Sequence, residues 1–599
     1  MAAADDDVVA VYDEIHQVPL EPSLLPLRRV RTDSSSSSVI FPPAQRPRLA
    51  PASVALSPSS SASSTSTDSS LFVAQNAIHQ AFSSAASVTS SLPNTLQQAL
   101  GSGHSAQWLG AVQKELEAHE TNGTWTLVNL PAGRRAIGCR WVFTIKDTTS
   151  PPTFKARLVA QGFRQVYGLD YFETFSPVVR YDSIRIVFAL CAQFGLQIHQ
   201  MDVTTAFLNG DLAEEIYMKV PDGVSAPGNV VCRLNKSLYG LKQAPLCWNE
   251  AINSVLLSAG FQRSVSEYGV YTKVDDCSVL IVTLYVDDLL ICSNDAAQIA
   301  EVKALLCSHY QMKDLGLVKT FLGMEVAQTA TQVSVKLSHY LSEFLADFNM
   351  QDCNPVTTPF AAGHDFIPGA PISDADTTRF RSMVGKLLFA ANTCRPDLAF
   401  AASTLSRYIK DPRDNHVAAA KHVLRYIKGT LDHGLVYMKS DVFKIVGFSD
   451  SDWAGDKYDR KSITGYVFML AGAAITWKSK KQPTVALSST EAEYMALGDT
   501  VKELLWLTQL LEQIGLHFPE PSVIYEDNEG CKLLSSHPVH HQRTKHIDIR
   551  HHFIRDHLKN NDFVLASART DDMAADMFTK NLGRLKFKGF TSLIGVQII

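Results

Sequence analysis

The amino-acid sequence predicts an α+β protein built from several domains. The chain has 599 residues, more than one hydrophobic core usually serves, so we expect roughly three or four structural units. Between about residues 160 and 325, short strand-like segments alternate with helical ones, the pattern of an α/β or α+β layer, and a fresh strand-rich unit follows Lys444. Between these two units, the stretch from Phe380 to Thr430 has an almost wholly helical pattern.

The first hundred residues have the composition of a disordered tail. Ser, Pro, Ala and Thr dominate from Arg28 to about Pro93, with an unbroken serine run from Ser34 to Ser38. Such a segment cannot bury enough apolar surface to offset the entropy lost on ordering. We therefore expect residues 1–100 to lack a fold, and order to begin with a short amphipathic helix around Trp108.

Strand signals open the first ordered unit. Asn122-Gly123 breaks the helix ahead of a strand-like segment at residues 125–130. Residues 141–145 and 154–159 have the apolar, β-branched and aromatic composition of two further strands, joined by a turn that contains two prolines. These elements predict a small strand-rich layer ahead of the larger α/β region.

Composition excludes several classes of protein. The net charge of −5 means that any basic channel for nucleic acid must be local. The ten cysteines include no C-x-x-C pair, which argues against zinc ribbons and a disulfide framework and favours a reducing compartment. No apolar run is long enough to cross a bilayer and no hydrophobic signal segment opens the chain. We therefore expect neither membrane insertion nor secretion.

Three carboxylates are predicted to lie at strand ends. Residues 196–203 form an imperfectly alternating, strand-like run with Asp202 near its end, and residues 279–292 form an apolar hairpin whose turn holds Asp287 and Asp288. Such carboxylates can bind two divalent ions about 3.5–4 Å apart and support phosphoryl transfer to a nucleotide. Oxygen ligands suit Mg²⁺, with Mn²⁺ as the alternative ion. A solvated turn is the competing interpretation, because aspartate is common in turns, but the acidic pair is the only charged feature of this hairpin tip.

Four motifs carry a resemblance to a known family. They are Lys155 to Gly162 (KARLVAQG), Gln200 to Gly210 (QMDVTTAFLNG), Ser237 to Pro245 (SLYGLKQAP) and Tyr285 to Asp288 (YVDD). Residues 108–580 resemble the reverse transcriptase and ribonuclease H part of the Pol polyprotein of copia-type, Pseudoviridae-like LTR retrotransposons. The motifs occur in the family's order.

The resemblance implies a right-hand polymerase with fingers, palm and thumb, followed by a helical connection and a ribonuclease H-like α/β domain. The implied domains are a disordered tail (1–100), fingers and palm (101–345), a helical thumb or connection (346–440), the ribonuclease H-like domain (441–585) and a C-terminal tail (586–599).

The resemblance also assigns roles around the nucleotide. Lys155 and Arg157 would hold the incoming triphosphate, although a solvated basic strand would show the same alternation. Phe207 would lie under the sugar, where its ring clashes with a 2′-hydroxyl and selects deoxynucleotides; a core aromatic is the alternative. Residues 321–324 resemble the hairpin that grips the primer, and a plain buried strand is an equal alternative. The remaining implied contacts line the nucleotide and template side, at Tyr239, Gly240 and Gln243, or lie beside the primer terminus, at Tyr285 and Val286.

Past Lys444 a second set of acids looks like that of the ribonuclease H fold. Its chemistry would be two-metal phosphodiester hydrolysis with a metal-activated water. Asp452 is a rival to the first acid and Asp572 to the last. Glu491 fits a helix cap, because it stands three residues after Ser488. The implied metal ligands are Asp450 on a strand, Glu493 on a helix, Asp527 at a strand end and Asp576 at the start of a last helix.

Two further clusters leave alternatives open. The histidines from His537 to His552 lack a partner cysteine pair for zinc, so a loop contacting nucleic acid is the better interpretation, with His546 a candidate for proton transfer. A basic run in the helical segment is either a solvated face or a set of phosphate contacts. It consists of Arg407, Arg413, Lys421, His422, Arg425 and Lys428.

The implied function is an RNA- and DNA-templated DNA polymerase of a retrotransposon with an attached ribonuclease H. Its partners would be an RNA template, a DNA primer, an RNA–DNA hybrid and deoxynucleoside triphosphates, in the cytoplasm, in virus-like particles or in the nucleus. The nucleocapsid, protease and integrase motifs of the full polyprotein are absent, so we expect a fragment or a shortened reading frame. The stretch Leu246 to Asn249 departs from the family where a basic residue usually stands near the Trp. A catalytically silent, nucleic-acid-binding relic is the alternative.

Overall fold

The computed structural model describes residues 92–146, 151–228, 230–275, 278–361, 364, 366, 369–536 and 548–599. The predicted tail up to residue 91 and the histidine-rich segment 537–547 lie outside these residues. One part of the tail prediction is wrong, because helix α3 (Leu96–Leu100) lies within it. Thr95 caps this helix by accepting a hydrogen bond from the Gln98 backbone N–H, and Leu96 and Ala99 are buried.

The first unit contains a long helix, a hairpin and a small sheet. Helix α4 (Ser105–Thr121) packs on a hairpin of β3 (Cys139–Lys146) and β4 (Thr153–Ala160), which confirms the predicted helix and strands. Trp108 is buried and meets Phe143 and Phe154 edge-on, which fixes the hairpin on the helix. The other sheet has the order β1-β7-β6-β2, formed by β1 (Trp125–Asn129), β2 (Ala136–Ile137), β6 (Tyr217–Lys219) and β7 (Val230–Leu234).

Strands between residues 197 and 317 form a six-stranded sheet, hereafter the hairpin sheet. The β10–β11 pair within it is the predicted apolar hairpin, and every residue of β10 except Tyr285 is buried. Its order is β12-β5-β11-β10-β9-β8, with β5 (Gln197–Val203), β8 (Gln262–Arg263), β9 (Val270–Asp275), β10 (Ser278–Tyr285), β11 (Asp288–Ser293) and β12 (Met312–Leu317). The helical elements of this region are η1 (Gly162–Arg164), α5 (Tyr181–Phe194), η2 (Ala206–Asn209), α6 (Ala244–Ser258) and α7 (Ala296–His309).

The predicted helical segment is confirmed, with short breaks. Between Phe380 and Thr430 it consists of most of α9 (Asp374–Thr393), followed by η3 (Pro396–Leu398), α10 (Ala399–Ser406) and α11 (Asp414–Gly429). Helix α8 (Ser338–Asp347) precedes this segment. The predicted C-terminal tail is wrong, because residues 586–599 contain most of α15 (Arg584–Leu593) and a strand that completes a sheet. That sheet has the order β13-β14-β15-β16-β22, with β13 (Thr320–Phe321), β14 (Met324–Gln328), β15 (Gln332–Lys336), β16 (His433–Met438) and β22 (Val596–Ile598).

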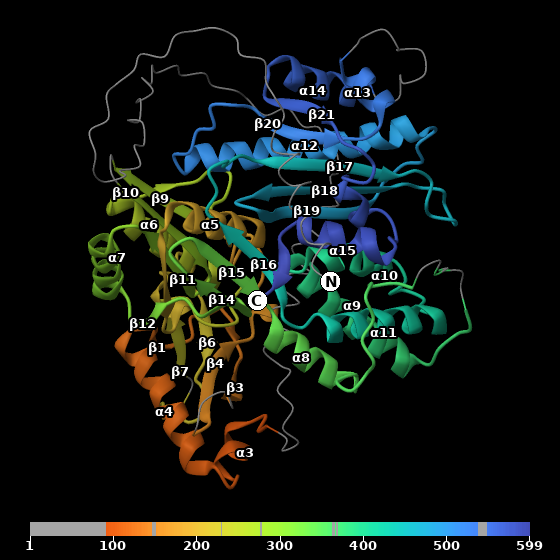
Figure 1. Ribbon diagram of the computed structural model, residues 1–599. Coiled ribbons are helices and arrows are strands. Elements are labelled where there is room, and N and C mark those ends of the chain that lie inside the picture. The colour runs from red at the N-terminus through yellow and green to blue at the C-terminus, as the bar shows by residue number, and fades with distance from the viewer. Residues whose placement is uncertain are drawn as a thin grey trace.

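The C-terminal sheet is the strand-rich unit predicted after Lys444. Three of its strands, β17, β20 and β21, run parallel, and helix α12 (Ser489–Gln513) packs across β17 and β18 (Figure 1). No helix among the described residues has both the length and the apolar composition to cross a bilayer. The sheet order is β19-β18-β17-β20-β21, with β17 (Val446–Asp452), β18 (Ile463–Leu470), β19 (Ala473–Lys481), β20 (Ser522–Glu526) and β21 (Phe563–Ser567). The remaining elements are α13 (Glu529–Ser536), α14 (Asp548–Lys559) and η6 (Ala574–Phe578).

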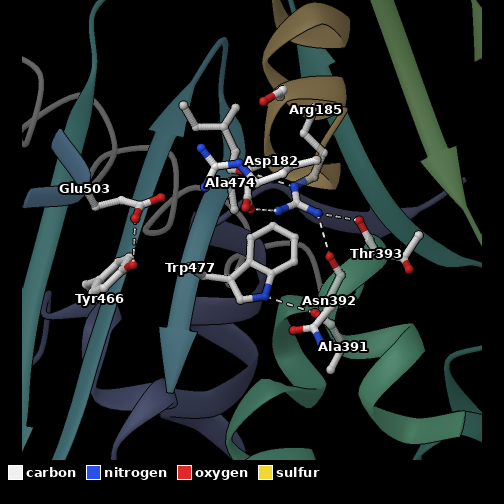
Figure 2. Close-up of polar contacts among 12 residues, drawn as sticks. Asp182, Arg185, Ala391, Asn392, Thr393, Tyr466, Ala474, Trp477 and Glu503 are labelled. Atoms are coloured by element: carbon white, nitrogen blue, oxygen red, sulfur yellow. Dashed lines mark hydrogen bonds and ion pairs between the residues drawn. The ribbon is translucent and has the colours of Figure 1, made fainter. Parts of the chain in front are cut away.

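A buried arginine joins three of these units. Arg185 on α5 is 1% exposed, and its Nε donates to the Ile475 carbonyl of β19 at 2.7 Å. Its Nη1 donates to the Asn392 and Thr393 carbonyls at the end of α9, both at 2.7 Å. Figure 2 shows the guanidinium against the Trp477 indole, with Cζ 3.9 Å from the ring centroid. Because one charged group satisfies backbone acceptors of two other units, these contacts hold the hairpin sheet, the helical segment and the C-terminal sheet together.

Helix α12 makes a second connection to the hairpin sheet. The Trp506 indole donates to the Ser266 carbonyl at 3.2 Å, and the Arg180 guanidinium lies 4.1 Å over its ring. Gln513 accepts a hydrogen bond from the Ser264 hydroxyl at 2.5 Å. The far end of α12 is therefore fixed to the loop before β9.

Candidate active sites

The first candidate site lies where β5 and the β10–β11 hairpin end. Asp288 stands directly opposite Asp202 in the register of β11 with β5, and Asp287 precedes it in the two-residue turn. All three side chains are half-buried, and Gln200 donates to Asp288 Oδ1 at 3.3 Å. The structure thus makes neighbours of the three acids predicted from the sequence. Among the described residues, they do not form a set whose oxygens all lie within 4.8 Å of one another.

The turn that carries Asp287 is strained and is held from two sides. Val286 has a φ of 56°, in the left-handed region that a β-branched residue rarely adopts. The Trp248 indole of α6 donates to the Val286 carbonyl at 2.6 Å, and the Val203 N–H donates to the Asp287 carbonyl at 2.9 Å. Sequence reasoning missed Trp248 as a support of the site. Its only signal was its place shortly after the SLYGLKQAP motif.

Three of the predicted nucleotide residues gather beside these acids. The Phe207 and Tyr239 rings meet edge-on at 4.9 Å, and the Arg157 guanidinium lies 5.6 Å from the Tyr239 ring centroid. Burial raises the pKa of Tyr239 to about 12; Arg157 opposes the rise, whereas the charges of Asp287 and Asp202 add to it. Tyr239 therefore lies close enough to both Arg157 of β4 and the acidic turn for their charges to shift its pKa.

The other predicted nucleotide residues differ in placement. Lys155 precedes the arginine by two positions on β4 and so shares its face of the strand. Gly240 has a φ of 90°, and a Cβ there would lie 2.2 Å from the Ala160 carbonyl, so only glycine fits this close approach. Gln243 is 1% exposed, and its side-chain Oε1 accepts a hydrogen bond from Gln165 Nε2 at 2.9 Å. This contact places Gln243 in the wall of the site, and its role on the nucleotide and template side stays a prediction.

The residues expected beside the primer also form tight turns. Burial raises the pKa of Tyr285 to about 12, and the charges of Asp288 and Asp287 add to the rise. Residues 321–324 form the predicted hairpin, in which Phe321 pairs with Met324 across a two-residue turn.

The second candidate site lies at the carboxyl ends of β17 and β20. Parallel pairing places Phe448 opposite Tyr525, and two residues further along these strands come Asp450 and Asp527. Glu493 of α12 completes a set whose carboxylate oxygens all lie within 4.8 Å of one another. Glu493 Oε2 is buried and has no hydrogen-bond partner among the described residues. An unpaired oxygen in such a set fits a bound cation, and oxygen ligands fit Mg²⁺ or Mn²⁺.

The fourth predicted acid, Asp576, joins this set through a lysine. It lies on η6, a 3₁₀ turn where a regular helix was expected, and is 1% exposed. Gly465 of β18 lets this turn approach, because a Cβ there would lie 2.5 Å from Thr579 Cγ2. The Lys580 ammonium lies 2.7 Å from Asp576 Oδ1 and 3.2 Å from Asp450 Oδ1.

Burial and like charge disturb the titration of the site. Burial, partly offset by Lys580, raises the pKa of Asp450 to about 6. Burial raises the pKa of Glu493 well above its usual value, and the neighbouring Glu526 carboxylate adds to the rise. Sequence reasoning missed Glu526, which is fully buried at the end of β20 and whose Oε2 has no partner among the described residues. The only sequence signal for it was the acidic pair at this strand end.

The rival acids have other places. Glu491 takes part in the cap at the start of α12, because its N–H donates to Ser488 Oγ at 3.2 Å and its carboxylate accepts the N–H of Leu487, one residue before the N-cap, at 2.8 Å. The predicted capping role of Glu491 is therefore confirmed. Asp572 is paired with Arg569 at 2.7 Å. Asp452 is half-buried at the end of β17 but lies outside the compact carboxylate set.

Several residues of the basic run have partners within the protein. Arg407 pairs with Asp456 at 3.4 Å, and Arg413 pairs with Asp411 at 2.6 Å. Arg425 donates to a backbone carbonyl at 2.7 Å. These contacts favour a structural role for the three arginines over dedicated phosphate binding.

Comparison with known proteins supplies the family context. Residues 122–362 match the family model described as reverse transcriptase (RNA-dependent DNA polymerase). The chain is 41% identical to the retrovirus-related Pol polyprotein from transposon TNT 1-94 of Nicotiana tabacum, over 84% of this chain and 39% of that polyprotein. It is 40% identical to the Pol polyprotein from transposon RE1 of Arabidopsis thaliana, over 84% of this chain and 34% of that one. The chain thus spans less than two fifths of the length of these relatives.

A shorter relative and a solved structure complete the comparison. The putative transposon Ty5-1 protein of Saccharomyces cerevisiae is 37% identical, over 51% of this chain and 100% of that protein. A foamy viral protease-reverse transcriptase solved with double-stranded DNA gives a TM-score of 0.44 at 11% identity, covering 78% of this chain and 70% of that one.

Proposed function

The chain belongs to the family of copia-type retrotransposon Pol polyproteins, and from this premise we propose that it is an RNA- and DNA-templated DNA polymerase with an attached ribonuclease H. In this proposal, residues 101–345 act as fingers and palm and residues 346–440 as thumb or connection. The C-terminal sheet with its helices acts as the nuclease. The substrates are an RNA template, a DNA primer, an RNA–DNA hybrid and deoxynucleoside triphosphates.

The observation that carries the polymerase proposal is the pairing of Asp202 with Asp288 beside the Asp287 turn. We assign these carboxylates to Mg²⁺, with Mn²⁺ as the alternative ion. When bound, two such ions activate the attacking 3′-hydroxyl and neutralise the leaving diphosphate. The strained turn, supported by Trp248, keeps two of the three carboxylates at a fixed place relative to β5.

The pocket residues have matching tasks in this proposal. Arg157 and Lys155 attract the triphosphate from β4, because a planar guanidinium and an ammonium both bind phosphate oxygens. Tyr239 holds Phe207 by an edge-on contact, so the ring can exclude a 2′-hydroxyl without shifting.

The nuclease proposal rests on the compact set of Asp450, Glu493 and Asp527. These residues would hold divalent ions that activate water for hydrolysis of a phosphodiester. Asp450 and Asp527 sit on neighbouring strand ends and Glu493 on the first turns of α12, so all three come from rigid elements.

Primer extension on an RNA template with Mg²⁺ tests the polymerase proposal. Asp287→Asn should abolish incorporation. Asp295→Asn is the matched control, because Asp295 caps α7 through its side chain and asparagine caps equally well. Equal incorporation by the wild type and Asp287→Asn would refute the assignment to this turn. Absence of incorporation by the wild type, together with retained binding of the hybrid, would favour the silent relic.

RNA-strand degradation in a hybrid tests the nuclease proposal. Glu493→Gln should abolish it, whereas Glu491→Gln should keep it, because Glu491 serves the helix cap. The two substitutions are chemically identical and lie two residues apart on one helix. Loss of cleavage in Glu491→Gln alone would reverse the assignment.

A further inference from the structure

We propose that Lys580 is a built-in counter-cation of the nuclease site, which holds Asp450 and Asp576 together and competes with divalent ions for them. The inference deepens the proposed nuclease function and depends on it for its biological meaning. It concerns a residue of the chain itself and predicts ion binding as well as activity.

The ammonium bridges two separate elements. Asp450 lies on β17 and Asp576 on η6, both are buried, and Lys580 Nζ reaches them at 3.2 and 2.7 Å. The other Asp450 oxygen accepts a hydrogen bond from the Thr579 hydroxyl. The second Asp576 oxygen accepts from Lys586 Nζ at 2.8 Å. Both buried carboxylates are thus fully engaged by groups of the C-terminal segment.

The rest of the acidic cluster has no such compensation. Glu493 Oε2 and Glu526 Oε2 are buried without a hydrogen-bond partner among the described residues. Each of these two acids keeps one oxygen without a partner, although the other Glu526 oxygen accepts the Asn528 N–H at 3.1 Å. They form the open half of the cluster, and the lysine-bound Asp450 and Asp576 form the closed half. We expect a divalent ion to bind first at Glu493 and the neighbouring Asp527, because binding Asp450 and Asp576 together requires the ammonium to move.

The lysine has freedom to move that the acids lack. Its side chain is 36% exposed, whereas those of Asp450 and Asp576 are 1% and 2% exposed. An unbranched ammonium stem can turn toward water and leave both carboxylates in place. Lys580 therefore keeps the acids from repelling one another before an ion arrives, and its positive charge opposes the arrival.

Calorimetric titration of the full chain with Mn²⁺ tests the proposal. The binding event that Glu493→Gln removes identifies the nuclease site. For that event, Lys580→Met should lower the dissociation constant by roughly tenfold, because one opposing unit charge a few ångströms away is lost in a partly hydrated site. Lys580→Arg should stay near the wild type. Lys502→Met is the matched control, because Lys502 is exposed on α12 and pairs with Asp499 at 3.7 Å, away from the acidic cluster. An unchanged or raised dissociation constant in Lys580→Met would overturn the proposal.

Thermal unfolding gives a second readout where Lys580→Met folds poorly. The variant should melt below the wild type in the presence of a chelator and recover more of its Tm than the wild type on adding Mn²⁺. A deficit that Mn²⁺ leaves unchanged would overturn the proposal, because Lys580 would then be only a structural partner. Cleavage of a hybrid by the wild type is scored separately. Mn²⁺ binding without cleavage refutes the nuclease function, and cleavage with identical Mn²⁺ affinity in Lys580→Met refutes the role of Lys580.

Discussion

Replacing Arg185 by methionine should destabilise the protein more than any exposed substitution. The side chain is 1% exposed and donates to the carbonyls of Ile475, Asn392 and Thr393, each at 2.7 Å. Methionine has a similar length and fills much of the same space, so the change removes the charge and the donors while leaving most of the packing.

The expected loss follows from these contacts. A hydrogen bond from a charged donor contributes about 1.5–3 kcal/mol, and a buried acceptor left without a partner costs about 1–3 kcal/mol. The contacts share one side chain and are not additive, so we expect a total loss of about 3–5 kcal/mol. The total includes the loss of the cation–π contact between the guanidinium and Trp477, visible in Figure 2.

Urea unfolding monitored by tryptophan fluorescence measures this loss. Arg381→Met is the matched control, because the exposed Arg381 makes one hydrogen bond, to the Ile409 carbonyl at 2.8 Å, and its loss should change the unfolding free energy by about 1 kcal/mol or less. We also expect an earlier, separate transition in Arg185→Met, because three units are released from one another. A midpoint equal to that of the wild type would refute the inferred role of Arg185 as a joint.

Three further predictions concern the two sites. Trp248→Phe keeps an aromatic ring but loses the N–H that donates to the Val286 carbonyl. Nucleotide incorporation in primer extension should therefore fall, and the free energy of unfolding in urea should drop by about 1–2 kcal/mol. Unchanged incorporation would contradict the inferred support of the turn by Trp248. Gly465→Ala should lower hybrid cleavage and leave primer extension intact, because the new methyl would meet Thr579 Cγ2 at 2.5 Å and displace η6; equal cleavage would show that the turn yields freely. The pKa of Asp450 is raised to about 6, so the folded state binds more protons than the unfolded state between about pH 4 and 6. The free energy of unfolding without metal ions should therefore fall as the pH rises through that window. Urea unfolding in the presence of a chelator measures this fall, and Asp450→Asn should flatten it.

Local patterns predicted the parts of the sites that depend on local sequence. The hairpin of β10 and β11 was predictable because two apolar segments separated by an acidic pair indicate two buried strands joined by a turn. The capping role of Glu491 was predictable because its signal lies within four residues.

Long-range pairing explains what the sequence could not reveal. Strand β22 has three residues and exists because it pairs with β16, so its segment resembles a tail when read alone. Arg185 is one polar position on an amphipathic helix, and its cited partners lie 207 and 290 residues away in the sequence. Gln243 and Glu526 are polar residues whose burial depends on the packing of distant loops, which periodicity does not encode.

We propose that two separate acidic sites on this chain perform two separate reactions. The most direct test follows primer extension and RNA-strand cleavage together on one primed RNA template in Mg²⁺. We predict that Asp287→Asn abolishes extension and keeps cleavage, and that Glu493→Gln abolishes cleavage and keeps extension. Loss of both reactions in either variant, or retention of both, would contradict the assignment of the two reactions to two separate sites.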